Sequence, residues 1–333
     1  MLGVNSEEVF VGGNASLALM FDIVSRAMTH GTGDLPWIKQ GKVKAICLVP
    51  GYDRHFSICQ HFGIEMVNVE IESEDINVEK IKELVESDDS FKMMWLIPKY
   101  NNPTGHIFSD SSLKALANIK PKAKDFRIIC DNAYSVHNWV EKPKEQVNFL
   151  QACKDAGNED LTFLIGSTSK VTYAGAGISF LAASKKNFDW FKSHAFFQTI
   201  GNDKINMLRH VKFLKDLNGI KEHMKKHAKI LKPKFDLALN ILDKNLSGKD
   251  IAKWTSPEGG YFISLNVKPG TAKRVEELAD KAGLKLTKAG ATYPYKKDPS
   301  DSNLRIAPSF PPINELEQAM ELLCVCVEIA ALE

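Results

Sequence analysis

The sequence lacks the features of several protein classes. None of its six cysteines forms a Cys-x-x-Cys pair, and tetrahedral metal sites want closely spaced ligands, so we expect buried free thiols and no metal site. No apolar run is long enough to span a bilayer. Residues 1–10 contain neither a basic region nor an apolar signal core. The net charge is only +2, which points to neither a nucleic-acid nor a membrane partner. We therefore expect a cytoplasmic protein.

The chain is typical of a soluble globular protein. Its 333 residues, 44% hydrophobic and 25% charged, suit one large domain and a smaller one. Strand and helix patterns alternate in the first half, which predicts an α/β fold with a mostly parallel sheet between helices. The expected strands are Lys44–Val49, Met93–Ile97, Arg127–Asp131, Thr162–Gly166 and Ile178–Ala183. The expected helices are Ser16–Thr29, Arg54–Phe62, Val78–Ser87, Ser111–Ile119 and Phe149–Ala156.

The second half of the chain has a different character. A long, lysine-rich helical pattern over 204–244 precedes an expected small α+β unit. We predict a large cofactor-binding domain over 1–215, then a connecting helix and a small C-terminal domain over 216–333. His223 and His227 lie one helical turn apart among lysines, which favours a solvated face over a metal site. The later elements are the strands Tyr261–Val267 and Asn303–Ala307 and the helices Lys273–Ala282 and Asn314–Leu332.

Two polar residues at predicted strand ends carry the strongest chemical signals. Lys170 follows the small residues of Gly-Ser-Thr-Ser at a strand end, a setting that suits a lysine forming a Schiff base. A solvated loop lysine is the alternative. Asp131 closes an apolar strand, and a buried carboxylate there needs a cationic partner such as a protonated pyridine nitrogen. A helix-capping aspartate is the alternative.

Further residues of the same kind follow other strands. Asn102 precedes a proline, which holds its backbone extended, and Tyr52 is placed to lie over an aromatic ring. The Gly12-Gly13 pair opens a helix whose N-terminus favours a phosphate. Arg305 sits inside a short apolar strand, where its planar fork suits a carboxylate. Plain turns and a structural ion pair are the alternatives.

Taken in the order in which they occur along the chain, these motifs resemble those of the fold-type I pyridoxal 5'-phosphate (PLP) dependent aminotransferases of class I/II. The resemblance covers essentially the whole chain. It is similar in detail to a bacterial subgroup that contains aspartate aminotransferases and is related to the effector domains of MocR-type regulators. The motifs are Gly-Gly-Asn-Ala-Ser at 12–16, Asn-Pro-Thr-Gly at 102–105, Asp-Asn-Ala-Tyr at 131–134, Ser-Thr-Ser-Lys at 167–170 with Val-Thr-Tyr-Ala-Gly-Ala-Gly after it, and Pro-Glu-Gly-Gly-Tyr-Phe at 257–262.

The resemblance implies a mostly parallel sheet of the seven-stranded type and a role for each matched residue. Lys170 would hold PLP covalently and later move the substrate proton, and Asp131 would pair with the pyridine nitrogen. Tyr134 and Asn102 would hold the ring oxygen. Arg305, with Asn102, would bind the substrate. Tyr52 would stack on the ring, and the phosphate would be held by Gly13, Asn14, Ala15 and Ser167, with Ser169 a weaker candidate.

Two departures from the family pattern accompany these matches. Ile178 stands where many relatives carry a phosphate-binding arginine, which leaves hydroxyls including Thr172, or a partner chain, to hold the phosphate. The resemblance also implies an N-terminal segment before the phosphate loop, which we expect this chain to lack. The implied activity is ping-pong amino transfer from L-aspartate to 2-oxoglutarate by a homodimer. A PLP-dependent lyase, a non-catalytic PLP-binding sensor and a truncated inactive relative are the alternatives.

Overall fold

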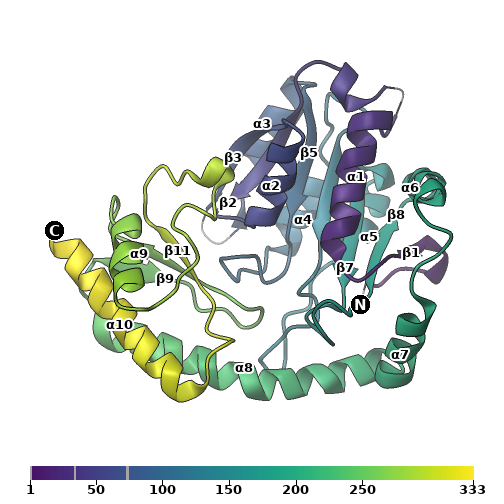
Figure 1. Cartoon of the computed structure of the whole chain (residues 1–333). Coiled ribbons are helices and arrows are strands. Elements are labelled where there is room, and N and C mark those ends of the chain that lie inside the picture. The colour runs from purple at the N-terminus through teal and green to yellow at the C-terminus, as the bar shows by residue number, and fades with distance from the viewer. Residues whose placement is uncertain (1, 34, 73–74) are drawn as a thin grey trace.

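A large, mainly parallel sheet forms the N-terminal part of the molecule (Figure 1). The structure is a computed structural model that describes residues 2–33, 35–72 and 75–333. The strand order is β1-β8-β7-β6-β5-β2-β3-β4. Strands β3, β2, β5, β6 and β7 are parallel, whereas β8, β1 and β4 pair antiparallel with their neighbours. The strands are β1 (Val9–Val11), β2 (Lys44–Val49), β3 (Glu65–Glu72), β4 (Asp75–Ile76), β5 (Phe91–Leu96), β6 (Arg127–Asp131), β7 (Thr162–Ser167) and β8 (Ser179–Ala183).

Helices cover both faces of this sheet because its central strands are apolar on both sides. In β6, Ile128 and Cys130 belong to one hydrophobic cluster with residues of α3, α4 and α5, and Ile129 belongs to another with residues of α1, α2 and α6. Because side chains alternate between the two faces of a strand, Asp131 points to the same face as Ile129, which is the face that α2 covers. The helices are α1 (Ser16–His30), α2 (Asp53–His61), α3 (Val78–Ser87), α4 (Asp110–Ala117), α5 (Phe149–Asp155) and α6 (Lys185–Gln198).

A second, three-stranded antiparallel sheet lies in the C-terminal part, in the order β11-β10-β9. In Figure 1 the long helix α8 runs along the bottom of the molecule, from below the large sheet to below the small one. Its apolar residues, among them Phe235 and Leu242, pack with the small sheet and with α9 and α10 into a separate core. The elements are α7 (Lys204–Leu214), α8 (Leu217–Leu246), β9 (Ala252–Trp254), β10 (Ile263–Val267), α9 (Ala272–Lys281), β11 (Asn303–Ile306) and α10 (Ile313–Leu332). The boundary predicted at residue 215 stays a prediction.

The structure differs from the predicted elements at several places, and the short strands β4 and β9 are among the elements that were not predicted. The single long helix expected over 204–244 is two helices, because Lys215 adopts a left-handed φ of 61° and Asp216 caps α8 by accepting from the Gly219 amide. Strand β3 was missed, although its alternating apolar residues carry the signal. Helix α6 was also missed, since its charged and aromatic residues form no clear apolar stripe.

The composition predicted buried free thiols and no apolar run long enough to span a bilayer. The six cysteines are all free and buried, as predicted. Within the described ranges, none of the helices combines the length and the apolar character needed to cross a membrane.

Candidate active site

A buried carboxylate lies at the carboxyl end of β6. Asp131 is 3% exposed, and its Oδ2 lies 3.3 Å from Nε2 of His55 on α2. The His55 ring stacks on Trp95, with 4.3 Å between ring centroids. Oδ1 of Asp131 is buried and has no hydrogen-bond partner among the described residues. Because an unpaired buried carboxylate oxygen is costly, this oxygen indicates a site for a cationic or protonated ligand group.

Tyr134 and Tyr52 flank this carboxylate. Burial, together with the charge of Asp131, raises the pKa of Tyr134 well above its ordinary value, while a hydrogen bond with Asn102 acts in the opposite direction. Burial raises the pKa of Tyr52 to about 12, against the opposing charge of Lys170. Tyr52 packs against the buried cluster that contains Tyr134, so the two phenols lie at one place. Both phenols are neutral near pH 7.

Lys170 lies on a short loop after β7, and its side chain is exposed. Its Nζ is 4.8 Å from the centroid of the Tyr134 ring. The carbonyl oxygen of Lys170 accepts a hydrogen bond from the Tyr261 hydroxyl at 3.2 Å and lies 3.4 Å from Nε2 of His137. The backbone of this lysine is therefore fixed by side chains from two other segments, while its amine stays accessible.

The loop before α1 is packed against the loop that carries Lys170 (residues 168–172, the lysine loop). The Ser169 hydroxyl donates to the Asn14 carbonyl at 2.8 Å, and the Asn14 amide donates to the Gly175 carbonyl at 3.2 Å. In the part of the chain that the structure describes, no side chain caps the N-terminus of α1 at Ala15. The first N–H groups of the helix therefore remain available to an anion.

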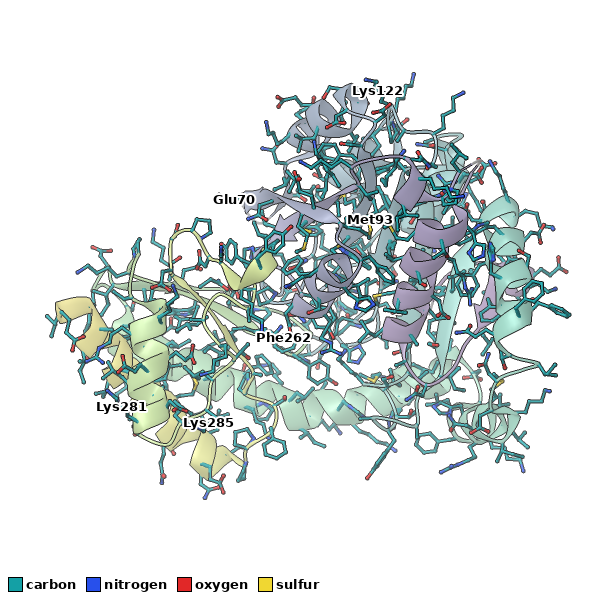
Figure 2. All side chains as sticks on the ribbon, turned by 45° about the horizontal axis from the view of Figure 1, so that its top comes forward. Glu70, Met93, Lys122, Phe262, Lys281 and Lys285 are labelled. Carbon is teal, nitrogen blue, oxygen red and sulfur yellow. The ribbon has the colours of Figure 1, made fainter. Side chains whose placement is uncertain are left out.

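Arg305 on β11 reaches this place from the small sheet. Its Nη1 donates to Oδ1 of Asp53 at 2.8 Å and to Oδ1 of Asn102 at 3.2 Å. Its Nε is buried without a partner among the described residues, and its Cζ lies 5.1 Å from the ring centroid of Phe262. Phe262 is labelled in Figure 2 between the two sheets. The unpaired side of the guanidinium is a donor site for a carboxylate.

The structure thus brings the predicted site residues together from both parts of the chain. Sequence reasoning missed His55, although it follows Tyr52 by one helical turn, and it missed Asp53 as the partner of Arg305. Thr172, which was suggested for the phosphate, and Ile178, at the position of the missing arginine, have other contacts. The Thr172 hydroxyl lies 2.9 Å from Nε2 of His210 on α7, and Ile178 uses its backbone N–H to bind the Thr168 hydroxyl.

The prediction of a solvated face for His223 and His227 is wrong. Both residues are half-buried. Nε2 of His223 lies 2.8 Å from the carbonyl oxygen of Val171, and the two histidines contact each other. Sequence pattern missed these contacts because only the tertiary fold places this turn of α8 under the lysine loop.

A buried aspartate, an accessible lysine and an uncapped helix N-terminus lie at the carboxyl edge of a mostly parallel sheet, and solved structures similar to this one are aminotransferases of fold type I. The comparisons with known proteins agree. The chain superposes on the crystal structure of an aspartate transaminase from Corynebacterium glutamicum with a TM-score of 0.97 and 44% identity, covering 99% of this chain and 78% of that one. A putative aminotransferase from Corynebacterium diphtheriae gives a TM-score of 0.97 at 47% identity, with 99% and 82% covered.

The sequence comparison identifies the family. The family model described as aspartate amino-transferase matches residues 1–333, and the chain belongs to this family. A putative aminotransferase of Mycolicibacterium smegmatis is 44% identical over 335 residues, which are 100% of this chain and 78% of the relative. More distant similarity extends to HTH-type transcriptional regulators, such as YisV of Bacillus subtilis at 23% identity over 214 residues, 64% of this chain and 42% of the regulator.

Proposed function

We propose that this aminotransferase moves the amino group of L-aspartate to 2-oxoglutarate in two half-reactions, with PLP as its cofactor. The observation that carries the proposal is the unpaired, buried Oδ1 of Asp131, three residues before Tyr134, whose ring centroid lies 4.8 Å from Nζ of Lys170. A protonated pyridine nitrogen is a partner that this oxygen fits. The relative of this family in Corynebacterium glutamicum, 44% identical, is named an aspartate aminotransferase, which supports the choice of substrate.

The residues present fit the cofactor group by group. Asp131 would hold the ring nitrogen, with His55 fixing its other oxygen. Tyr134 and Asn102 would bind the ring oxygen, and Tyr52 would lie on the ring. The phosphate would be held by N–H groups and hydroxyls of Gly13, Asn14, Ala15 and Ser167. Ser169 is the weaker candidate here, because its hydroxyl proton is already donated to the Asn14 carbonyl.

When bound, PLP supplies an aldehyde that takes up the amino group and a ring that delocalises charge from the substrate carbon. Arg305 would bind the substrate α-carboxylate through its unpaired side, while Asp53 and Asn102 hold the rest of the guanidinium in place. Lys170 would attach to the cofactor, and once released its amine would move the proton at the substrate α-carbon. Asp131 would keep the ring nitrogen protonated throughout.

We further propose that the protein works as a homodimer. Large apolar side chains of α6, α7 and the segment between them are exposed: Phe196, Phe197, Ile200, Ile205, Val211 and Phe213. An apolar area of this kind on a soluble protein marks a contact surface. A second copy would also bring further groups to the phosphate, where Ile178 offers no cation.

The test is the visible absorption spectrum of the purified protein with PLP, before and after addition of L-aspartate. We expect a band that shifts with aspartate and returns with 2-oxoglutarate. Lys170→Ala should abolish the covalent band and lower amino transfer by about 10³-fold or more, whereas Lys114→Ala, a change at an exposed lysine on α4, should leave both unchanged.

The products separate the proposal from its alternatives. A keto acid formed with amino transfer supports it, and pyruvate with ammonia would identify a lyase. A band that forms but responds to no amino acid would identify a sensor, in line with the HTH-type relatives. Transfer at the wild-type rate by Lys170→Ala would overturn the assignment of Lys170.

A further inference from the structure

The loop that carries Lys170 is short and is held by its own turn. The amides of Val171 and Thr172 both donate to the Thr168 carbonyl at 2.9 Å. These two bonds do not use the carbonyls of Lys170 and Val171, which meet side chains from other segments. Because the lysine side chain is exposed, the direction in which its amine points depends on how this backbone is fixed.

Helix α8 supplies a partner for the second of these carbonyls. Nε2 of His223 lies 2.8 Å from the Val171 oxygen. A carbonyl only accepts, so Nε2 of His223 carries a proton and donates it. The imidazole is held in turn by Phe213 of α7, with ring centroids 5.1 Å apart at 79°. A residue more than fifty positions away thus fixes the peptide next to the lysine.

His227 supports the same ring from one turn further along α8. The two Nε2 atoms are 3.1 Å apart, and the ring centroids are 4.7 Å apart. Because the protonated Nε2 of His223 has no lone pair with which to accept, the facing Nε2 of His227 carries no proton and can serve only as a second acceptor for the same N–H. His227 is then neutral, with its proton on Nδ1. Burial and the neighbouring His223 both lower the pKa of His227, which agrees with this assignment.

A pair of histidines one turn apart is also a common metal-binding pattern. A metal ion would need the lone pair of the Nε2 atom that donates to Val171. The contact with the carbonyl therefore favours a hydrogen-bonded pair over a chelate.

We propose that His223, supported by His227, is a positioning residue for Lys170. It fixes the Val171 peptide and thereby the backbone from which the lysine side chain projects. The inference rests on the proposed function only in taking Lys170 as the residue that holds PLP. The contact itself belongs to the protein without cofactor.

The test compares His223→Ala with His223→Gln, whose amide can still donate to the Val171 carbonyl. Lys225→Ala, an exposed residue on the same helix, is the matched control. Hydrogen–deuterium exchange of the lysine loop is measured on the protein without PLP. With PLP, the pH midpoint of the visible band, kcat and KM are measured.

We expect His223→Ala to speed exchange in the lysine loop by about tenfold or more and to shift the pH midpoint of the band. It should lower kcat by about tenfold with little change in KM, because a misplaced catalytic group loses rate more than binding. His223→Gln should restore most of each value, and Lys225→Ala should match wild type. His227→Ala should give a smaller effect in the same direction.

The outcomes separate this inference from the proposed function. If His223→Ala folds and matches wild type in exchange, midpoint and kcat, the inference is overturned while the function stands. If wild type forms no band with PLP, the function fails, and exchange without cofactor still decides whether His223 holds the loop. If His223→Ala fails to fold, His227→Ala and His223→Gln decide: faster exchange in the first and near-wild-type exchange in the second support the inference, and no change in His227→Ala overturns it.

Discussion

At the scale of single residues, the site depends on groups kept in one protonation state by burial. His137 is 1% exposed and lies against the backbone of Lys170 and the ring of Tyr134, at 5.7 Å between centroids. Burial and the charge of Lys170 lower its pKa to about 3. The imidazole is therefore neutral in the folded protein throughout the ordinary pH range.

This depressed pKa predicts how stability depends on pH. The unfolded chain takes up a proton at His137 near pH 6.5, and the folded protein does so only near pH 3. Between these values the unfolded state binds more protons, so the free energy of unfolding falls as the pH falls, by up to about 1.4 kcal/mol per pH unit from this residue. The slope ends near pH 3.

Urea unfolding at pH 7 and pH 5 measures the effect. His137→Gln is neutral over the whole range, so its free energy of unfolding should lose less than that of wild type between the two pH values. His61→Gln, a change at an exposed histidine, is the control and should keep the wild-type slope. An unchanged slope in His137→Gln would show that this imidazole is not the group that titrates.

At the scale of elements, the loop 257–262 joins the small sheet to the site. Gly259 pairs with Asn138 in an isolated bridge, and the Trp139 and Gly260 amides complete the junction by donating to the carbonyls of Glu258 and His137 at 3.0 Å each. A Cβ on Gly259 would lie 2.3 Å from Cζ of Tyr100 and 2.4 Å from the His137 carbonyl oxygen. The junction therefore requires glycine for its close approach.

Gly259→Ala should accordingly lower the free energy of unfolding by about 1–3 kcal/mol, the usual cost of overpacking. It should also weaken binding of L-aspartate, because Tyr261 and Phe262 follow directly and contact Lys170 and Arg305. The matched control is Gly33→Ala, whose Cβ would meet only the Asp125 side chain at 3.6 Å. Equal denaturation midpoints for the two variants would contradict the close-approach argument.

At the scale of the whole molecule, α6 and α7, which carry these exposed apolar side chains, lie on the same side of the fold as β1 and β8 (Figure 1). Phe197 is 85% exposed and Ile205 is 70% exposed. If this surface joins two copies, charges placed on it must be buried without a partner, which association does not tolerate.

Sedimentation velocity checks this. We expect a dimer for wild type and a monomer for Phe197→Lys combined with Ile205→Lys. Phe310→Lys is the control, because Phe310 is 95% exposed but lies in the turn before α10. A double variant that still sediments as a dimer would place the contact elsewhere. A monomeric wild type would show that this surface does not join two copies.

Local sequence was enough to predict the alternating elements and the residues at their ends. Apolar runs such as 44–49 and 127–131 fold as strands because both sides are buried, and parallel strands bring Asp131, Asn102 and Lys170 to one edge of the sheet. The spacing of apolar residues and the residue types at strand ends are local properties of the sequence, so they can be recognised without the tertiary structure. The same holds for the helix that opens after Gly13.

The side chains that hold these groups in place are set by long-range packing. His55 meets Asp131, Asp53 meets Arg305, and His223 meets Val171 across separations of 52 to 252 positions. No periodicity encodes such pairs, because they depend on the crossing of separate elements. A left-handed Lys215 turns one predicted helix into two and sends α8 beneath the lysine loop. Local pattern predicted the reactive groups, and long-range packing set their partners, since burial and distance exist only once the chain has folded.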